Sequence, residues 1–146
     1  MVAGPDQHIP AGRSVFFARC RERLAAFAEH HFRLSSPVGD GQPLRKHLES
    51  VARQTGQRPP GLDGPPLPRQ LAYIWGWYEE LARWRPKGDW GPVDIDLRTI
   101  ENWARLTGRH PTGWEIDCIK AIDDVFLAQV AKNREAADQQ RRGRHG

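Results

Sequence analysis

The sequence predicts an all-α fold, a small irregular bundle of about five helices with a proline-rich linker and a frayed basic C-terminal tail. In five segments, apolar residues recur at spacings of three and four, as one face of a helix requires. Proline, glycine and helix-capping residues separate these segments. No segment shows the sustained alternation of apolar and polar residues that a half-buried strand needs.

The first helix is expected after a loose leader, residues 1–13, which contains two prolines and two glycines. Ser14 can cap this helix, which then runs to about Leu34. Its apolar face consists of Phe16, Phe17, Cys20, Leu24, Phe27 and Ala28. The charged residues of the segment fall on its other faces, so the helix is expected to pack through one side.

Turn-forming residues over 35–41 predict a loop before a shorter second helix, from about Pro43 to just before Gly56. The apolar stripe of this helix is Leu44, Leu48, Val51 and Ala52. The next segment, residues 57–68, has the sequence QRPPGLDGPPLP, with five prolines and two glycines. Such a segment cannot be helical and is expected to be largely extended.

We therefore divide the chain into four parts. An N-terminal helical segment over 1–56 is followed by a linker over 57–68, a tryptophan-rich core domain over 69–131 and a flexible basic tail over 132–146. Lys and Arg outnumber Asp and Glu by three in residues 1–68 and by three again in the last fifteen residues, whereas residues 69–131 carry a net charge of −2. Net positive charge is thus confined to the N-terminal and C-terminal parts of the chain. The simplest interpretation is that these parts are solvated flanks.

The third helix is expected over residues 69–84 and has an apolar surface too wide for one neighbouring helix. Its core-facing arc consists of Leu71, Ile74, Trp75, Tyr78, Leu81 and Ala82. Tyr73, Trp77 and Trp84 lie beside that arc, and Trp90 follows in an irregular loop over 85–92. These four aromatic residues are the candidate partner-binding residues.

The last two helices carry clear end signals. Asp96 suits the N-cap of the fourth helix and Gly108 its left-handed C-cap, while Thr112 and Glu115 form a capping box for the fifth. The fourth helix has the apolar stripe Leu97, Ile100, Trp103, Ala104 and Leu106. The fifth is expected to bury Trp114, Cys118, Ile119, Ile122, Val125 and Phe126 and to fade after Val130.

No group of residues indicates catalysis, a metal site or a cofactor. His30 and His31 are adjacent, so on a helix they point about 100° apart and cannot share an ion. The neighbouring aspartates 123 and 124, and the pair at 94 and 96, are expected to be solvated or structural. Cys20 and Cys118 lie on apolar faces, where a thiol packs as a small hydrophobe, and two cysteines fit a reducing cytosol.

Membrane and nucleic-acid functions are also disfavoured. No apolar run approaches the length of a membrane span, and the first residues lack the pattern of a signal peptide. Residues 106–112 join two helices, but the second helix opens with Glu115 and Asp117, which phosphates would repel. Two alternatives stay open: a DNA-associated regulatory protein that uses the basic tail, and an accessory subunit of an unidentified complex.

Several short motifs occur in a fixed order. They are LAYIWGWYEEL at 71–81, Gly-Pro-Val at 91–93, IENWARLTG at 100–108, Trp114-Glu115 and Ile122-Asp123, preceded by HLESVARQTG at 47–56. In this order and spacing they resemble the tail assembly chaperones of long-tailed bacteriophages and prophages, over about residues 47–130. Gly113 departs from the proline that the family has before Trp-Glu, and Ala121-Ile122 replaces the usual approach to a Met-Asp pair. Residues 1–45 lie outside the resemblance.

The resemblance implies a non-enzymatic protein without cofactors, made in the cytoplasm of the host bacterium. Such chaperones bind the long tape measure protein, keep it soluble, recruit the major tail (tube) protein and leave before the tail is complete, so that they are absent from the mature virion. A homo-oligomer is a further possible assembly. Exposed aromatic residues suit transient binding of apolar helical segments.

Overall fold

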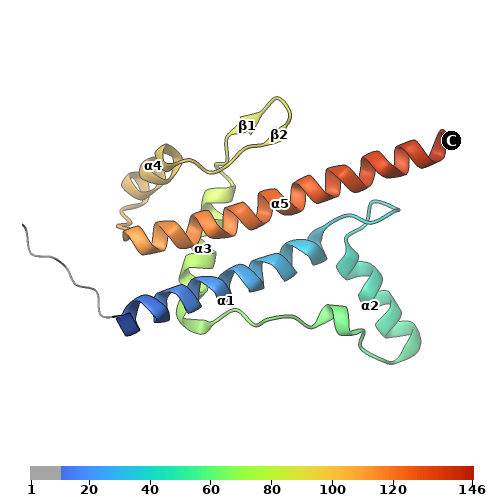
Figure 1. The fold of residues 1–146 in the computed structure, drawn as a ribbon, viewed down its shortest axis with the longest axis horizontal. Helices are drawn as coiled ribbons and strands as arrows, with labels where there is room; N and C mark the ends of the chain where they lie inside the picture. The colour runs from blue at the N-terminus through green and yellow to red at the C-terminus, as the bar shows by residue number, and fades with distance from the viewer. Residues whose placement is uncertain (1–10) are drawn as a thin grey trace, which may run out of the picture.

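The computed structural model describes residues 11–146 and confirms the all-α class and the five helices over that range (Figure 1). Two short 3-10 turns and a minimal hairpin complete it. In chain order the elements are α1 (Ala11–Ser35), α2 (Leu44–Thr55), η1 (Pro60–Leu62), η2 (Arg69–Leu71), α3 (Ala72–Ala82), β1 (Lys87–Gly88), β2 (Gly91–Pro92), α4 (Leu97–Thr107) and α5 (Gly113–Arg144).

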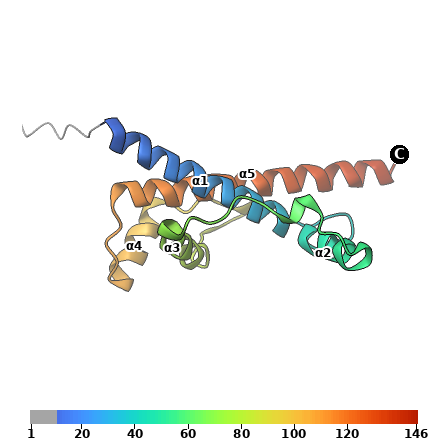
Figure 2. The same cartoon turned by 90° about the horizontal axis from the view of Figure 1, so that it is seen from below.

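Helices α1 and α5 lie side by side and run parallel (Figures 1 and 2). Near their N-terminal ends, the rings of Phe17 and Trp114 have centroids 4.9 Å apart. Further along, Asn133 Nδ2 donates to Ser36 Oγ at 3.0 Å. Because these contacts are nineteen residues apart on both helices, the pair stays in register over about 28 Å.

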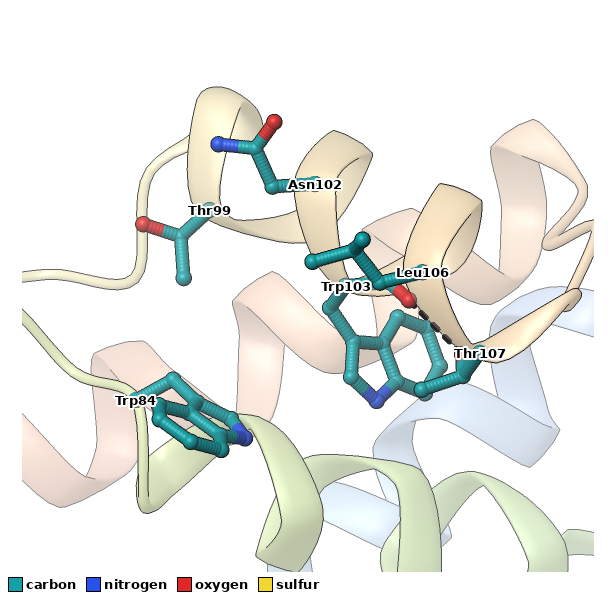
Figure 3. A pocket seen from close by; sticks show the side chains of 6 residues that line it. All are labelled: Trp84, Thr99, Asn102, Trp103, Leu106 and Thr107. Carbon is teal, nitrogen blue, oxygen red and sulfur yellow. Dashed lines mark hydrogen bonds between the residues drawn. The ribbon is translucent and has the colours of Figure 1, made fainter.

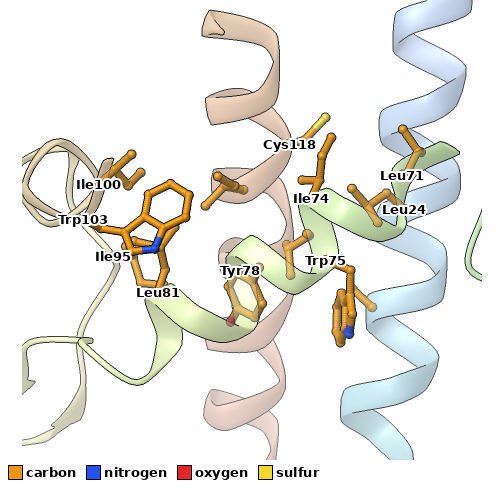
Figure 4. Close-up of a cluster of buried hydrophobic side chains, with 13 residues drawn as sticks. Leu24, Leu71, Ile74, Trp75, Tyr78, Leu81, Ile95, Ile100, Trp103 and Cys118 are labelled. Carbon is orange, nitrogen blue, oxygen red and sulfur yellow. The ribbon is translucent and has the colours of Figure 1, made fainter. Parts of the chain in front are cut away.

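Helix α3 crosses this pair, and the core lies at the crossing (Figure 4). The predicted core arc of α3 is confirmed for five of its six residues, which are buried, while Ala82 is partly buried. Helix α1 supplies Leu24 and Ala28, and α5 supplies Cys118, Ile119 and Ile122. The core therefore draws side chains from both sides of residues 57–68, and the division of the chain into domains stays a prediction.

The first two helices differ from their predictions in detail. Helix α1 begins by Ala11, so Ser14 lies inside it and is not its cap; residues 1–10 of the predicted leader lie outside the described residues. Phe16 is 61% exposed, since the first turns of α1 extend past the core. The stripe of α2 has no fully buried residue and Val51 is 44% exposed, because this helix packs mainly on α1 and η1. Its predicted end is confirmed, with Gly56 in the left-handed conformation at φ 70°.

The proline-rich segment packs against α1. One 3-10 turn at Pro60–Leu62 interrupts its extended course, so the prediction that it has no helical part is wrong. Such a turn needs few hydrogen bonds, and a proline at its first position gives up no donor that the turn would use. Leu62 is buried, and the carbonyl of Gly61 lies 3.1 Å from His30 Nε2.

The C-terminal residues are helical, so the predicted end near Val130 and the frayed tail are wrong: α5 continues to Arg144. Strong helix formers such as Ala136 and Ala137 follow Val130, and the contact from Asn133 to Ser36 ties this stretch to the end of α1.

The loop predicted over 85–92 contains a two-stranded hairpin. Lys87 pairs with Pro92 and Gly88 with Gly91, so Asp89 and Trp90 form a two-residue turn. Gly91 has a φ of 118°, which glycine adopts without strain. Two residues per strand are too few to give the alternating pattern by which a strand is recognised in a sequence.

The end signals of α4 and α5 are confirmed. Asp96 accepts a hydrogen bond from Thr99 N at 2.7 Å, and Gly108 is left-handed at φ 68°. Thr112 and Glu115 form the capping box, with bonds of 2.8 and 3.2 Å. The predicted stripe of α4 is wrong at its two edges, where Leu97 and Leu106 are 65% and 76% exposed. Helix α4 touches the rest of the protein along a narrow line that buries only Ile100 and Trp103.

The two cysteines are free, and burial raises the pKa of the Cys118 thiol to about 11. Since the thiolate is the reactive form, we expect Cys118 in the native protein to react with a thiol reagent at pH 8 far more slowly than a free thiol. Cys20, which is partly buried, should react faster than Cys118 but still slowly. Absorbance assays with and without denaturant measure both rates, and rapid native labelling of Cys118 would contradict its burial.

Candidate partner-binding surface

A row of aromatic rings runs along the side of α3 that faces α4. The ring centroids of Tyr73 and Trp77, one helical turn apart, are 5.1 Å from each other. The Trp77 ring in turn lies 5.6 Å from Trp103 of α4. Trp77 is half-buried and Tyr73 is 44% exposed, so the row leads from the core to the surface.

An apolar groove lies where the C-terminal end of α3 meets α4 (Figure 3). Its volume is about 330 Å³. The lining residues are Trp84, Thr99, Asn102, Trp103, Leu106 and Thr107. Trp84 and Leu106 are 71% and 76% exposed, whereas Trp103 is buried at the base. Trp103 belongs to both the row and the groove and therefore joins them into one surface.

A polar clamp holds this surface together. Glu80 accepts a hydrogen bond from Trp103 Nε1 at 3.0 Å through one carboxylate oxygen and from Arg109 Nη2 at 2.8 Å through the other. The guanidinium carbon of Arg109 lies 5.7 Å from the Trp77 ring centroid and 5.6 Å from that of Trp103, within the range of cation–π attraction. The clamp fixes α4, and the loop that follows it, against α3.

Three of the four predicted site residues lie on one side of the molecule. Tyr73 contacts Trp77, and Trp77 contacts Trp103. Trp84 lines the groove together with Trp103. Trp90 lies apart, in the hairpin turn, with 88% of its surface exposed. Sequence reasoning assigned Trp103 and Leu106 to the core stripe alone. The sequence did indicate that Leu106 could be exposed, because it lies about 60° from Trp103 around the helix, at the edge of the apolar stripe.

A buried ion pair anchors the segment that connects α3 to α4. Arg85 Nη2 lies 2.5 Å from Asp123 Oδ1, and Asp123 has no exposed surface. The other carboxylate oxygen accepts from the backbone N–H of Ile95 at 2.8 Å. Tyr78 also donates to Asp123, and burial raises the pKa of its hydroxyl, which keeps the donor proton in place. The sequence predicts that Asp123 is either solvated or structural, and the structural role is confirmed.

Three further observations on the described residues concern metal binding, membrane crossing and the environment of His31. Within residues 11–146, no three His, Cys, Asp or Glu side chains gather as a metal site would require. Over the same residues, no helix has the length and apolar character needed to cross a membrane. The ring of His31 packs 5.0 Å from that of Trp75, and burial lowers the pKa of His31.

The chain matches a known protein family. Neither the curated proteins nor the solved structures contain a match to this chain. The phage tail assembly chaperone family matches residues 51–128, which is more than half of the sequence and includes α3, α4 and the first half of α5. The chain therefore belongs to the phage tail assembly chaperone family.

Proposed function

We propose that this protein binds the tape measure protein transiently through the groove between α3 and α4, and that it brings tail tube subunits to it during tail assembly. It acts without catalysis in the cytoplasm of the host bacterium and leaves before the virion is complete. Membership of the family supports a role with phage tail proteins in general. The observation that carries the finer assignment is the groove, which exposes two large apolar side chains beside a buried tryptophan.

The chemistry of the groove fits an apolar helical segment. Its lining is mainly apolar, with polar side chains from Thr99, Asn102 and Thr107 at the rim. An amphipathic helix laid in such a groove buries apolar side chains at every third or fourth position, while the polar rim fixes its orientation. Covering one large aromatic side chain contributes on the order of 2–3 kcal/mol. Trp84 should gain most on binding, because it is the larger of the two exposed apolar side chains of the groove and is 71% exposed.

We expect Trp84→Ala and Leu106→Ala each to weaken binding of the tape measure protein about tenfold or more, because both remove exposed contact surface. Leu97→Ala is the matched control, since Leu97 is also largely exposed on α4 but lies outside the groove. Co-expression and co-purification with the tape measure protein measure binding, and thermal melts verify that all three variants fold. Full co-purification by both groove variants would contradict the proposed site.

A further inference from the structure

A second cavity lies at the end of the molecule where α1 and α5 begin (Figures 1 and 2). Its volume is about 330 Å³, and its lining residues are Ser14, Phe17, Ala18, Arg21 and Trp114. The rings of Phe17 and Trp114, whose centroids are 4.9 Å apart, form its apolar wall. Four of the five lining residues belong to α1, which precedes the range matched by the family. The cavity shares no lining residue with the α3–α4 groove and is a separate site.

Every polar side chain that lines the cavity can donate a hydrogen bond, and none is a carboxylate. Ser14 contributes a hydroxyl, Arg21 a guanidinium and Trp114 an indole N–H. The indole N–H is buried and has no acceptor among residues 11–146. Arg21 takes part in none of the ion pairs found over those residues. The cavity therefore has donors and positive charge without a matching acceptor.

Positive charge also surrounds the cavity. Residues 13–23 of α1 include four arginines and one glutamate. The guanidinium carbon of Arg13 lies 5.8 Å from the ring centroid of Phe17, which places a second cation at the edge of the cavity. On α5, the carboxylate of Glu115 accepts the backbone N–H of Thr112 in the capping box, and neither Glu115 nor Asp117 lines the cavity. The charge of this end of the molecule is complementary to an acidic ligand.

We propose that this cavity binds an acidic segment of a partner protein, in which an apolar side chain lies next to a carboxylate. The apolar side chain packs on the rings of Phe17 and Trp114. One carboxylate oxygen pairs with Arg21, and the other accepts the indole N–H of Trp114. Such a ligand supplies the acceptor that the buried N–H lacks, and hydrogen bonds between a guanidinium and a carboxylate are among the strongest in proteins. This inference does not rest on the proposed function, because the two sites have no residue in common.

Nuclear magnetic resonance of the indole N–H groups tests this proposal in the full chain. The protein has six tryptophans, and Trp114→Phe identifies the resonance of Trp114 by its loss. The probe is a short blocked peptide with a central phenylalanine–glutamate pair, and the control peptide has glutamine in place of glutamate. The acidic peptide should shift the Trp114 resonance downfield until it saturates. The control peptide should bind about tenfold more weakly, because it lacks the charge.

Arg21→Gln should weaken binding of the acidic peptide about tenfold, because it removes the cation that pairs with the carboxylate. Arg23→Gln is the matched control, since it removes the same charge at a position that does not line the cavity. Its effect should stay within about twofold. Both arginines are exposed, so both variants should fold. Trp84→Ala, which alters the α3–α4 groove, should leave peptide binding unchanged, so failure of one site is distinguishable from failure of the other.

Three results would each overturn the proposal: equal binding of the two peptides, a Trp114 resonance that does not move, or equal effects of Arg21→Gln and Arg23→Gln. A fourth test concerns the chain itself, since Asp6 is the one acidic residue of residues 1–10. Asp6→Asn should leave the Trp114 resonance of the protein alone unchanged. If it moves that resonance, the chain's own carboxylate occupies the cavity, and the proposal of a partner segment is wrong.

Discussion

Replacing Asp123 by alanine is expected to destabilise the fold by about 3–5 kcal/mol, a typical cost of removing one partner from a buried ion pair. The substitution leaves the guanidinium of Arg85, whose side chain is only 10% exposed, without its carboxylate. It also leaves the backbone N–H of Ile95 without its acceptor. Both losses fall at the junction of the hairpin, α3 and α5, so the loop that carries Trp90 should loosen as the stability falls.

Asp124→Ala is the matched control, since Asp124 is adjacent on α5 and exposed. Its effect should stay within about 0.5 kcal/mol, as for most surface substitutions. Urea unfolding followed by tryptophan fluorescence gives the free energy of unfolding for both variants. Equal effects at the two positions would show that the Asp123 carboxylate is not buried in an ion pair in solution.

The parts of the fold that depend on local chemistry were predictable from the sequence. A cap such as Asp96 bonds to a backbone N–H three residues away, and Gly108 ends a helix through its own conformation. The core arc follows from helical spacing over residues 71–82, where five of its six side chains are buried. Each of these features involves residues close together in the chain, so their types and spacing are sufficient evidence.

The features that could not be predicted from the sequence depend on contacts between residues far apart in the chain. Arg85 and Asp123 are 38 residues apart, and Glu80 and Arg109 are 29 apart, so no local pattern pairs them. The hydrogen bond from Asn133 to Ser36, which ties α5 beyond Val130 to the end of α1, joins residues 97 apart. For the candidate site, three of the four aromatic residues could be placed on one side of α3, whereas the separate position of Trp90 depends on the hairpin.

The second large effect on stability is expected at Trp103, the buried residue at the base of the groove. Trp103→Ala should lower the free energy of unfolding by about 3–5 kcal/mol, because a large aromatic side chain leaves a cavity that its neighbours fill only in part. Trp103 is 5% exposed and packs on Trp77 across the interface of α3 and α4. The variant also loses the indole N–H that bonds to Glu80, which weakens the clamp formed with Arg109.

Two further variants separate packing from the hydrogen bond and from surface exposure. Trp103→Phe keeps an aromatic ring but loses the donor to Glu80, so its cost should be intermediate. Trp84→Ala removes an equally large side chain from the same groove, yet it should change stability by less than about 1 kcal/mol, because Trp84 is 71% exposed. Urea unfolding of the three variants gives this order directly. If Trp84→Ala destabilised the protein as much as Trp103→Ala, Trp84 would be covered in solution, and the groove would not be open to a partner.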